Sequence, residues 1–302
     1  MNKVVVFEDI LIRILNIFYG ASIFFLIAVG LNLIYGVMKL VNLAHTALFA
    51  FGAYIVAGTL IKILAGFVEL PIGFLIVIPP IAAGLTVLAV SGAISPLLTY
   101  AARKSEDVQL ILTFGLLLIF EDMLRGLWGP VPVVSNEAYM RSGMFSLGGS
   151  QYPLYNIYVM IFVGGMVIAL WLFLHKARVG MLFRATSMDI EMTSALGADV
   201  RKVIIGAILI AGLLAGLGGG LYVPAASATL GMSIEYLVYA FVIIVIGGLG
   251  SFVGSLLGSF IVSALRTLSL AFFPELELAL LYVVAIAILL IKPEGLGGGK
   301  GW

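Results

Sequence analysis

Residues able to do covalent or metal chemistry are few in this 302-residue chain. It contains no cysteine and only two histidines, His45 and His175, which excludes thiolate nucleophiles, disulfides and a multi-histidine metal site. The patterns H-E-x-x-H and G-x-S-x-G are absent. Glu121 and Asp122 are adjacent and point to different helix faces, which argues against a catalytic carboxylate pair. We therefore expect no enzyme activity, no metal and no cofactor.

Polar side chains stand at a few places inside long apolar stretches. Asn32 lies within the first apolar segment, and Asn42 and His45 lie at the start of the second. Such groups need partners in an apolar environment, so they face protein or a cavity. They either line a polar path or make structural hydrogen bonds that hold a turn. The same alternatives apply to Glu121 and Asp122, because their charges can also be neutralised by Arg125, which stands four residues after Glu121.

Glycine recurs with four-residue spacing in two places. On a helix, this spacing puts each trio on one face, where another backbone can approach closely. We therefore predict close helix packing at both trios, either within one subunit or at a sliding or dimer contact. The two trios are Gly212, Gly216 and Gly220, and Gly250, Gly254 and Gly258.

The elements that carry these residues belong in a lipid bilayer. Hydrophobic residues make up 63% of the chain and charged residues only 10%, too few charges to cover a water-soluble surface. The net charge of +1 argues against nucleic acid as a partner. The stretch 234–272 is too long for one helix, and the sequence GGLGS at 247–251 breaks it. We predict an all-α polytopic membrane protein with eight or nine transmembrane helices, in one domain over 1–302. The expected apolar segments are 11–35, 46–66, 72–98, 108–128, 154–175, 203–224, 234–272 with its break, and 276–291.

Basic residues are concentrated in two loops, near 99–107 and at 176–202, which places those loops in the cytoplasm. With nine crossings, the basic C-terminal tail lies there too. Glu275 and Glu277 are interpreted as outer-surface charges, either solvated or in contact with a partner.

The loop 176–202 is the one long polar interruption on the inner side. Its pattern predicts one short amphipathic helix, with Asp189 near its start and Gly197 at its end. Such a helix either docks into a partner's groove or lies on the bilayer. Met188, Met192, Ala195 and Leu196 recur at helical spacing, while Asp189, Glu191 and Ser194 face elsewhere.

The string RATSMDIEMTSALGADVRKVI resembles the cytoplasmic coupling segment of branched-chain amino-acid ABC transporter permeases, the LivH/LivM type. Arg184, Ala185, Asp189 and Gly197 keep the family's spacing, and Thr193 replaces its usual Ala. Three further stretches, 31–54, 246–258 and 289–298, are similar to other family motifs in the same order. The first contains Asn42, Ala44 and His45, with Thr46 in place of the expected Gly.

The resemblance implies a permease in the cell membrane that forms half of a translocation pathway for branched-chain or related amino acids. Its implied partners are two cytoplasmic ABC ATPases, a second permease (a paralogue or a second copy) and an extracellular substrate-binding protein. The chain lacks a G-x-x-x-x-G-K-[ST] loop of its own. Residues expected to couple to the ATPases are Arg184, Asp189, Glu191, Thr193, Leu196 and Gly197, and those on a possible translocation path are Asn32, Asn42, His45, Glu121 and Asp122. The alternative function is an ion-coupled secondary transporter of a small polar metabolite, which the glycine-rich broken helix and the buried carboxylates also suit.

Overall fold

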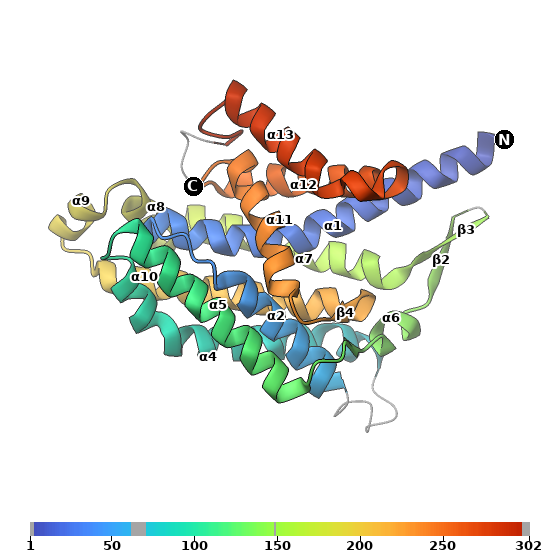
Figure 1. The fold of residues 1–302 in the computed structure, drawn as a ribbon, viewed down its shortest axis with the longest axis horizontal. Coiled ribbons are helices and arrows are strands. Elements are labelled where there is room, and N and C mark those ends of the chain that lie inside the picture. Colours follow the sequence, from blue (N-terminus) through green and yellow to red (C-terminus); the bar gives the residue numbers. More distant parts are fainter. Residues whose placement is uncertain (1–2, 62–70, 148, 298–302) are drawn as a thin grey trace.

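A computed structural model of the chain describes residues 3–61, 71–147 and 149–297 (Figure 1). Over these residues it is mainly helical, as predicted, and six helices are long and apolar enough to cross a membrane. They begin with α1 (Lys3–Met38), α4 (Ile72–Ala101) and α7 (Leu154–Lys176) and continue with α10 (Val200–Tyr222), α12 (Phe252–Phe272) and α13 (Glu277–Ile291, preceded by the 3-10 turn η3, Pro274–Leu276).

Three further helices are apolar but shorter or more charged. A π-helical turn, η1 (Val56–Leu60), extends α2 (His45–Ile55), and α11 (Met232–Gly247) has only 16 residues. The 23-residue helix α5 (Glu106–Trp128) carries charged residues near both ends. With the six long helices these make nine apolar helices among the described residues. The end of the predicted segment 46–66 lies partly outside those residues, as does the tail beyond 297.

The two ends of the molecule differ. At the left of Figure 1 lie α8 (Arg178–Met188), α9 (Ile190–Ala195), the start of α5 and the last described residues. We call this the basic end, because both Lys/Arg-rich loops meet there. At the right lie the start of α1, α6 (Glu137–Arg141) and the hairpin of β2 (Met144–Leu147) and β3 (Ser150–Pro153). We call this the hairpin end. The shared position of the two basic loops agrees with the predicted orientation.

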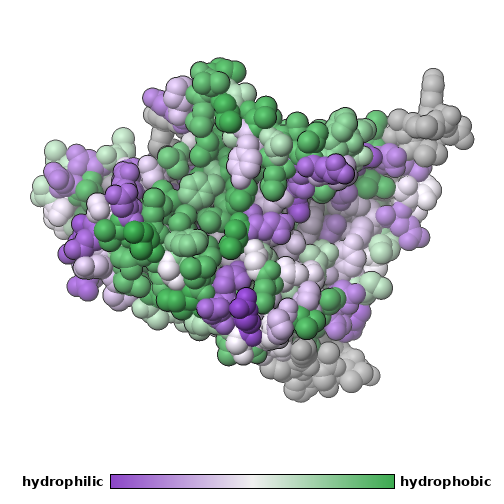
Figure 2. Space-filling view, viewed as in Figure 1, coloured by the Kyte–Doolittle hydropathy of each residue, from purple (hydrophilic) through white to green (hydrophobic). Residues whose placement is uncertain are grey.

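Helix α10 lies at the centre of the bundle. It packs against α4, α2 and α1, while α12 packs along α1. Small residues allow the close approach, since Gly216 contacts Val87 of α4 and Gly218 contacts Phe49 of α2. Apolar side chains also cover much of the surface drawn in Figure 2, as expected where lipid is the solvent. Ile111, Leu290 and Ile291 are among the most exposed.

The chain after α10 does not run straight through the bundle. The turn η2 (Val223–Ala225) and strand β4 (Ser227–Ala228) follow α10, and β4 pairs antiparallel with β1 (Val133–Val134). In Figure 1, α11 then runs steeply across the directions of α1 and α12. At the predicted break the chain turns back, so that Ile243 of α11 lies against Gly258 of α12.

Candidate functional site

The predicted coupling segment forms two helices instead of one. Asp189 has an extended backbone, with φ −153° and ψ 107°, and this residue separates α8 from α9. Its Oδ1 accepts a hydrogen bond from the Met192 N–H at 2.8 Å. Aspartate is favoured at this capping position because it satisfies an otherwise free N–H of the first turn. Asp189 therefore starts α9, as predicted, but it also ends α8, which the sequence pattern did not indicate.

The other end of α9 is closed by Gly197, as predicted. Its φ of +88° lies in the left-handed region, which glycine adopts without a steric penalty. The Gly197 N–H bonds to the Ser194 carbonyl at 3.0 Å, and the Ala198 N–H bonds to the Thr193 carbonyl at 3.3 Å. The Thr193 hydroxyl donates back to the Asp189 carbonyl at 2.6 Å. Local hydrogen bonds thus fix both ends of this six-residue helix.

Helix α8 anchors this unit to the membrane helices. Phe183 is fully buried, with its ring 5.9 Å from that of Phe173 in α7. Gly180 lies directly against the Phe173 carbonyl, where any side chain would collide. On another side, Lys39, just after α1, donates to the Ser187 carbonyl at 3.3 Å. A displacement of α9 would therefore reach α1 and α7 through packed contacts.

Apolar side chains project from the tip of this unit. Met188 is 85% exposed and Leu196 is 82% exposed, and Met192 lies between them at 58%. Figure 1 places α9 at the far left, away from the bundle. Large apolar residues that are exposed together at one tip mark a surface that a partner can cover. Glu191 lies beside them and is exposed, while Arg184 and Thr193 face inward. The coupling roles of all six residues stay predictions.

Asn32 sits at the turn between α11 and α12. Its side-chain carbonyl accepts from the Gly250 N–H at 2.9 Å, and its amide donates to the Ser251 carbonyl at 3.1 Å and to the Ser255 hydroxyl at 2.7 Å. The last described residues close the same turn, because the Leu296 and Gly297 N–H groups bond to the Ile246 and Gly247 carbonyls at 2.8 and 2.7 Å. Asn32 is fully buried, so it touches no open cavity in this conformation.

Asn42 and His45 hold the short connection between α1 and α2. The Asn42 side-chain oxygen accepts from the Ala44 N–H at 3.2 Å, and His45 Nε2 lies 3.0 Å from the Ile27 carbonyl. Both side chains are fully buried. These are the hydrogen bonds that the structural alternative predicts. A place on a translocation path stays a prediction for both residues.

The two carboxylates in α5 have different surroundings. Glu121 accepts from the Gly231 N–H at 3.1 Å, which ties α5 to the start of α11. Asp122 is exposed and lies 3.8 Å from Arg125. The pairing of Glu121 with Arg125, which the spacing allowed as one alternative, does not form. Glu121 turns toward the Gly231 backbone, and Arg125 lies near Asp122 instead. A place on a translocation path stays a prediction for both carboxylates.

The two glycine trios behave differently. Gly212, Gly216 and Gly220 all face α4, so their close contacts lie within one subunit. The expectation that Gly250 shares a helix face with Gly254 and Gly258 is wrong. Gly250 lies in the turn before α12, where its φ is +76°. Gly254 and Gly258 do share a face and pack against the α11 backbone.

An ion pair near the hairpin end was not predicted from the sequence. Arg266 Nε lies 3.1 Å from Glu277 Oε1, and the Tyr239 hydroxyl donates to the same oxygen. The Glu277 side chain is only 15% exposed, so the prediction of a surface charge is wrong for this residue. Arg266 also lines a cavity of about 380 Å³ between α1 and α12, together with Arg13 and Tyr19. No sequence signal joins these residues, because α11, α12 and the start of α13 each supply one member of the cluster.

Comparisons with known proteins agree with this architecture. The family described as "Branched-chain amino acid transport system / permease component" matches residues 13–289. The chain is 26% identical over 311 residues to the high-affinity branched-chain amino acid transport system permease protein LivH of Escherichia coli (strain K12), covering 96% of this chain and 97% of the relative. It is 26% identical to the permease protein BraD of Pseudomonas aeruginosa, covering 92% of each chain. It is 27% identical to the probable permease protein LivH of Methanocaldococcus jannaschii, covering 92% and 89%. No solved structure matches the chain.

Proposed function

The chain belongs to the family of branched-chain amino acid transport permeases, and we propose that it forms half of the membrane pathway of an ATP-driven importer. It is a multi-pass protein of the cell membrane. The observation that carries the proposal is the unit of α8 and α9 at the basic end. This unit is anchored to three membrane helices and exposes Met188 and Leu196 at its tip.

The proposed motor lies outside this chain. Since the sequence lacks a phosphate-binding P-loop, ATP hydrolysis falls to two cytoplasmic ATPase subunits. A groove on each ATPase would receive α9 of one permease, in the way that a groove takes the apolar face of a helix. A second permease, identical or paralogous, would complete the pathway, and an extracellular binding protein would deliver the substrate.

The proposed mechanism is alternating access without covalent chemistry. Closure of the ATPases displaces α9, and the packed contacts of α8 carry that displacement to α1, α7 and α10. Packed interfaces move between discrete arrangements instead of deforming continuously, so a small shift at α9 can re-aim whole helices. The substrate is not chemically changed at any stage.

The proposed cargo is a branched-chain or related amino acid. The names of the three relatives all refer to branched-chain amino acids. The buried surface agrees with a moderately polar path, because few charged side chains lie inside the described bundle.

A charge placed on the tip of α9 tests the docking step. Leu196→Glu puts a carboxylate on a side chain that is 82% exposed, so the fold of the permease should be unaffected. Val131→Glu is the matched control, since Val131 is 69% exposed near the hairpin end. We expect the Leu196 variant to enter the membrane normally but to lose co-purification with the ATPases, while the control keeps it. Normal co-purification of the Leu196 variant would refute the docking role.

Transport itself separates the importer from the ion-coupled alternative. Vesicles that contain both permeases, the ATPases and the binding protein should accumulate leucine only when ATP is supplied. Accumulation by this chain alone, driven by an ion gradient, would refute the proposal.

A further inference from the structure

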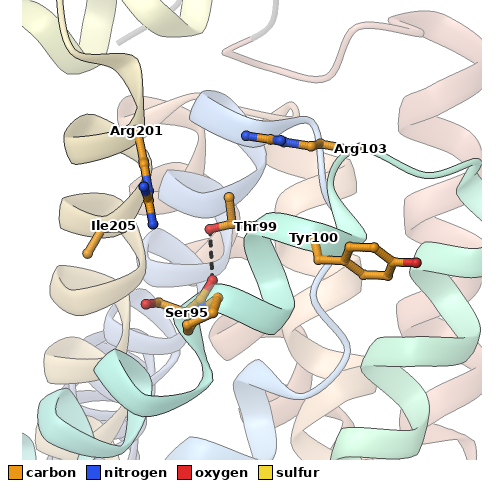
Figure 3. A pocket seen from close by; sticks show the side chains of 7 residues that line it. Ser95, Thr99, Tyr100, Arg103, Arg201 and Ile205 are labelled. Atoms are coloured by element: carbon orange, nitrogen blue, oxygen red, sulfur yellow. Dashed lines mark hydrogen bonds between the residues drawn. The ribbon is translucent and has the colours of Figure 1, made fainter.

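A hollow at the basic end lies between the end of α4 and the start of α10 (Figure 3). Its volume is about 350 Å³. Arg103 reaches across Thr99 from one side, and Arg201 extends down from α10 on the other. The hollow is lined by Ser95, Pro96, Thr99, Tyr100, Arg103, Arg201 and Ile205.

The two arginines that converge on this hollow are not neutralised by the chain itself. Across residues 3–61, 71–147 and 149–297, no Asp or Glu forms an ion pair with Arg103 or Arg201. Asp199, the acidic residue nearest to Arg201 in sequence, pairs with Lys202 at 3.0 Å instead. The Ser95 and Thr99 hydroxyls donate to backbone carbonyls at 2.8 and 2.7 Å. The guanidinium groups, with up to five N–H donors each, therefore dominate the chemistry of the hollow and favour an anion.

The surroundings indicate what kind of anion fits. Tyr100 is 54% exposed, and Leu97 one turn before it is also exposed, so an apolar surface runs from the arginines along α4. α4 is itself one of the long apolar helices that can cross the membrane. A ligand with a charged head and an apolar tail could contact both the basic hollow and the apolar surface of α4. A free anion would contact only the hollow. Lys104 stands over the Tyr100 ring at 4.7 Å and adds a third cation at the rim.

We propose that this hollow binds the phosphate headgroup of an anionic phospholipid from the leaflet at the basic end, with the acyl chains lying along α4. Basic pockets between membrane helices at the cytoplasmic side have the charge and depth that anionic headgroups need. The proposal does not depend on the ATPases or on the cargo. It requires only that the arginines lie where the membrane meets water.

The site adjoins the coupling unit. A second hollow of about 250 Å³ shares Thr99, Arg103 and Arg201 with the first and reaches Ile190, the first residue of α9, and Met38 at the end of α1. A headgroup held by the arginines would therefore border the contact between α9 and the membrane helices. Loss of the lipid should loosen α9 relative to α1 and α10.

Purified full-length chain in detergent gives a direct test. Phosphatidylglycerol, phosphatidylcholine and inorganic phosphate are added separately, and the melting temperature and the lipid retained in native mass spectrometry are measured. Phosphatidylglycerol alone should raise the melting temperature, because a ligand that binds the folded state stabilises it. An equal rise with phosphatidylcholine would overturn the proposal. An equal rise with inorganic phosphate would mean a small-anion site and would overturn the lipid assignment.

Variants locate the binding. The double variant Arg103→Gln with Arg201→Gln should bind phosphatidylglycerol about thirtyfold more weakly, and each single variant about fivefold, which is the usual effect of one cation near an anionic lipid. The control, Lys176→Gln with Arg178→Gln, removes two exposed cations from the same end but not from the hollow. Unchanged retention in the double variant, or an equal loss in the control, would refute the site. So would a double variant that retains lipid fully but loses the ATPases, since the arginines would then serve a protein partner.

Discussion

Replacing Asn32 by leucine separates a structural role from a role in substrate passage. The substitution keeps the number and branching of the side-chain heavy atoms but leaves the Gly250 N–H without its partner at 2.9 Å. An orphaned buried donor costs about 1–3 kcal/mol. The bonds to Ser251 and Ser255 are lost as well, but those oxygens keep other partners within α12, so this further cost is about 1 kcal/mol. We expect a total destabilisation of about 3 kcal/mol.

Unfolding in detergent, titrated with sodium dodecyl sulfate and followed by circular dichroism, measures this loss. Asn16→Leu is the matched control, because Asn16 lies on the same helix but is exposed and has no hydrogen bond among those of the described residues. The control should change stability by no more than about 0.5 kcal/mol. If Asn32→Leu is as stable as the control but transport is lost, Asn32 serves the path and the account of the α11–α12 turn is wrong.

Three further perturbations test other contacts. Gly219→Ala should destabilise the chain by about 1–3 kcal/mol in the same unfolding titration, since its new methyl group would collide with a backbone carbonyl of α2. The control Gly165→Ala has open space around it and should not be destabilised. Equal stabilities of the two variants would contradict the packing of α10 on α2. Arg266→Met should cost about 1–3 kcal/mol, because the mostly buried Glu277 carboxylate loses its counter-charge and keeps only the Tyr239 hydroxyl, and unchanged stability would show that the ion pair contributes nothing. Hydrogen bonding to Lys202 lowers the pKa of Asp199, so this pair stabilises the fold above the carboxyl's ordinary pKa, and the stabilisation is lost as pH falls through the lowered value. Asp199→Asn should remove that part of the acid dependence in pH-resolved melts, and identical acid profiles would refute it.

The sequence was sufficient to predict features that depend on residues close together in the chain. Apolar runs placed the membrane helices, and glycines placed the turn between α11 and α12. The capping chemistry of Asp189 and the left-handed preference of Gly197 placed both ends of α9. These features depend on residues within a few positions of each other, where side-chain type alone decides the outcome.

Features that depend on tertiary packing could not be predicted. The extended backbone at Asp189 splits the coupling segment in two. It directly follows α8, which packs on α7 through Phe183, a contact that the sequence pattern does not show. Glu277 was interpreted as a surface charge because no pattern shows that α12 brings Arg266 beside it. The convergence of Arg103 and Arg201 likewise follows from the packing of α4 on α10, which hydrophobic periodicity does not specify.

Labelling of a cysteine on α9 tests the central claim most directly, and the absence of natural cysteines makes a single Ser194→Cys variant unambiguous. Ser194 is exposed between the two ends of α9. In inside-out vesicles, a membrane-impermeant maleimide should label this cysteine rapidly, and added ATPase subunits should suppress the labelling. Met140→Cys, at the hairpin end, should be labelled only from the opposite side. Labelling of Ser194→Cys from outside the cell, or labelling that the ATPases do not slow, would contradict the account.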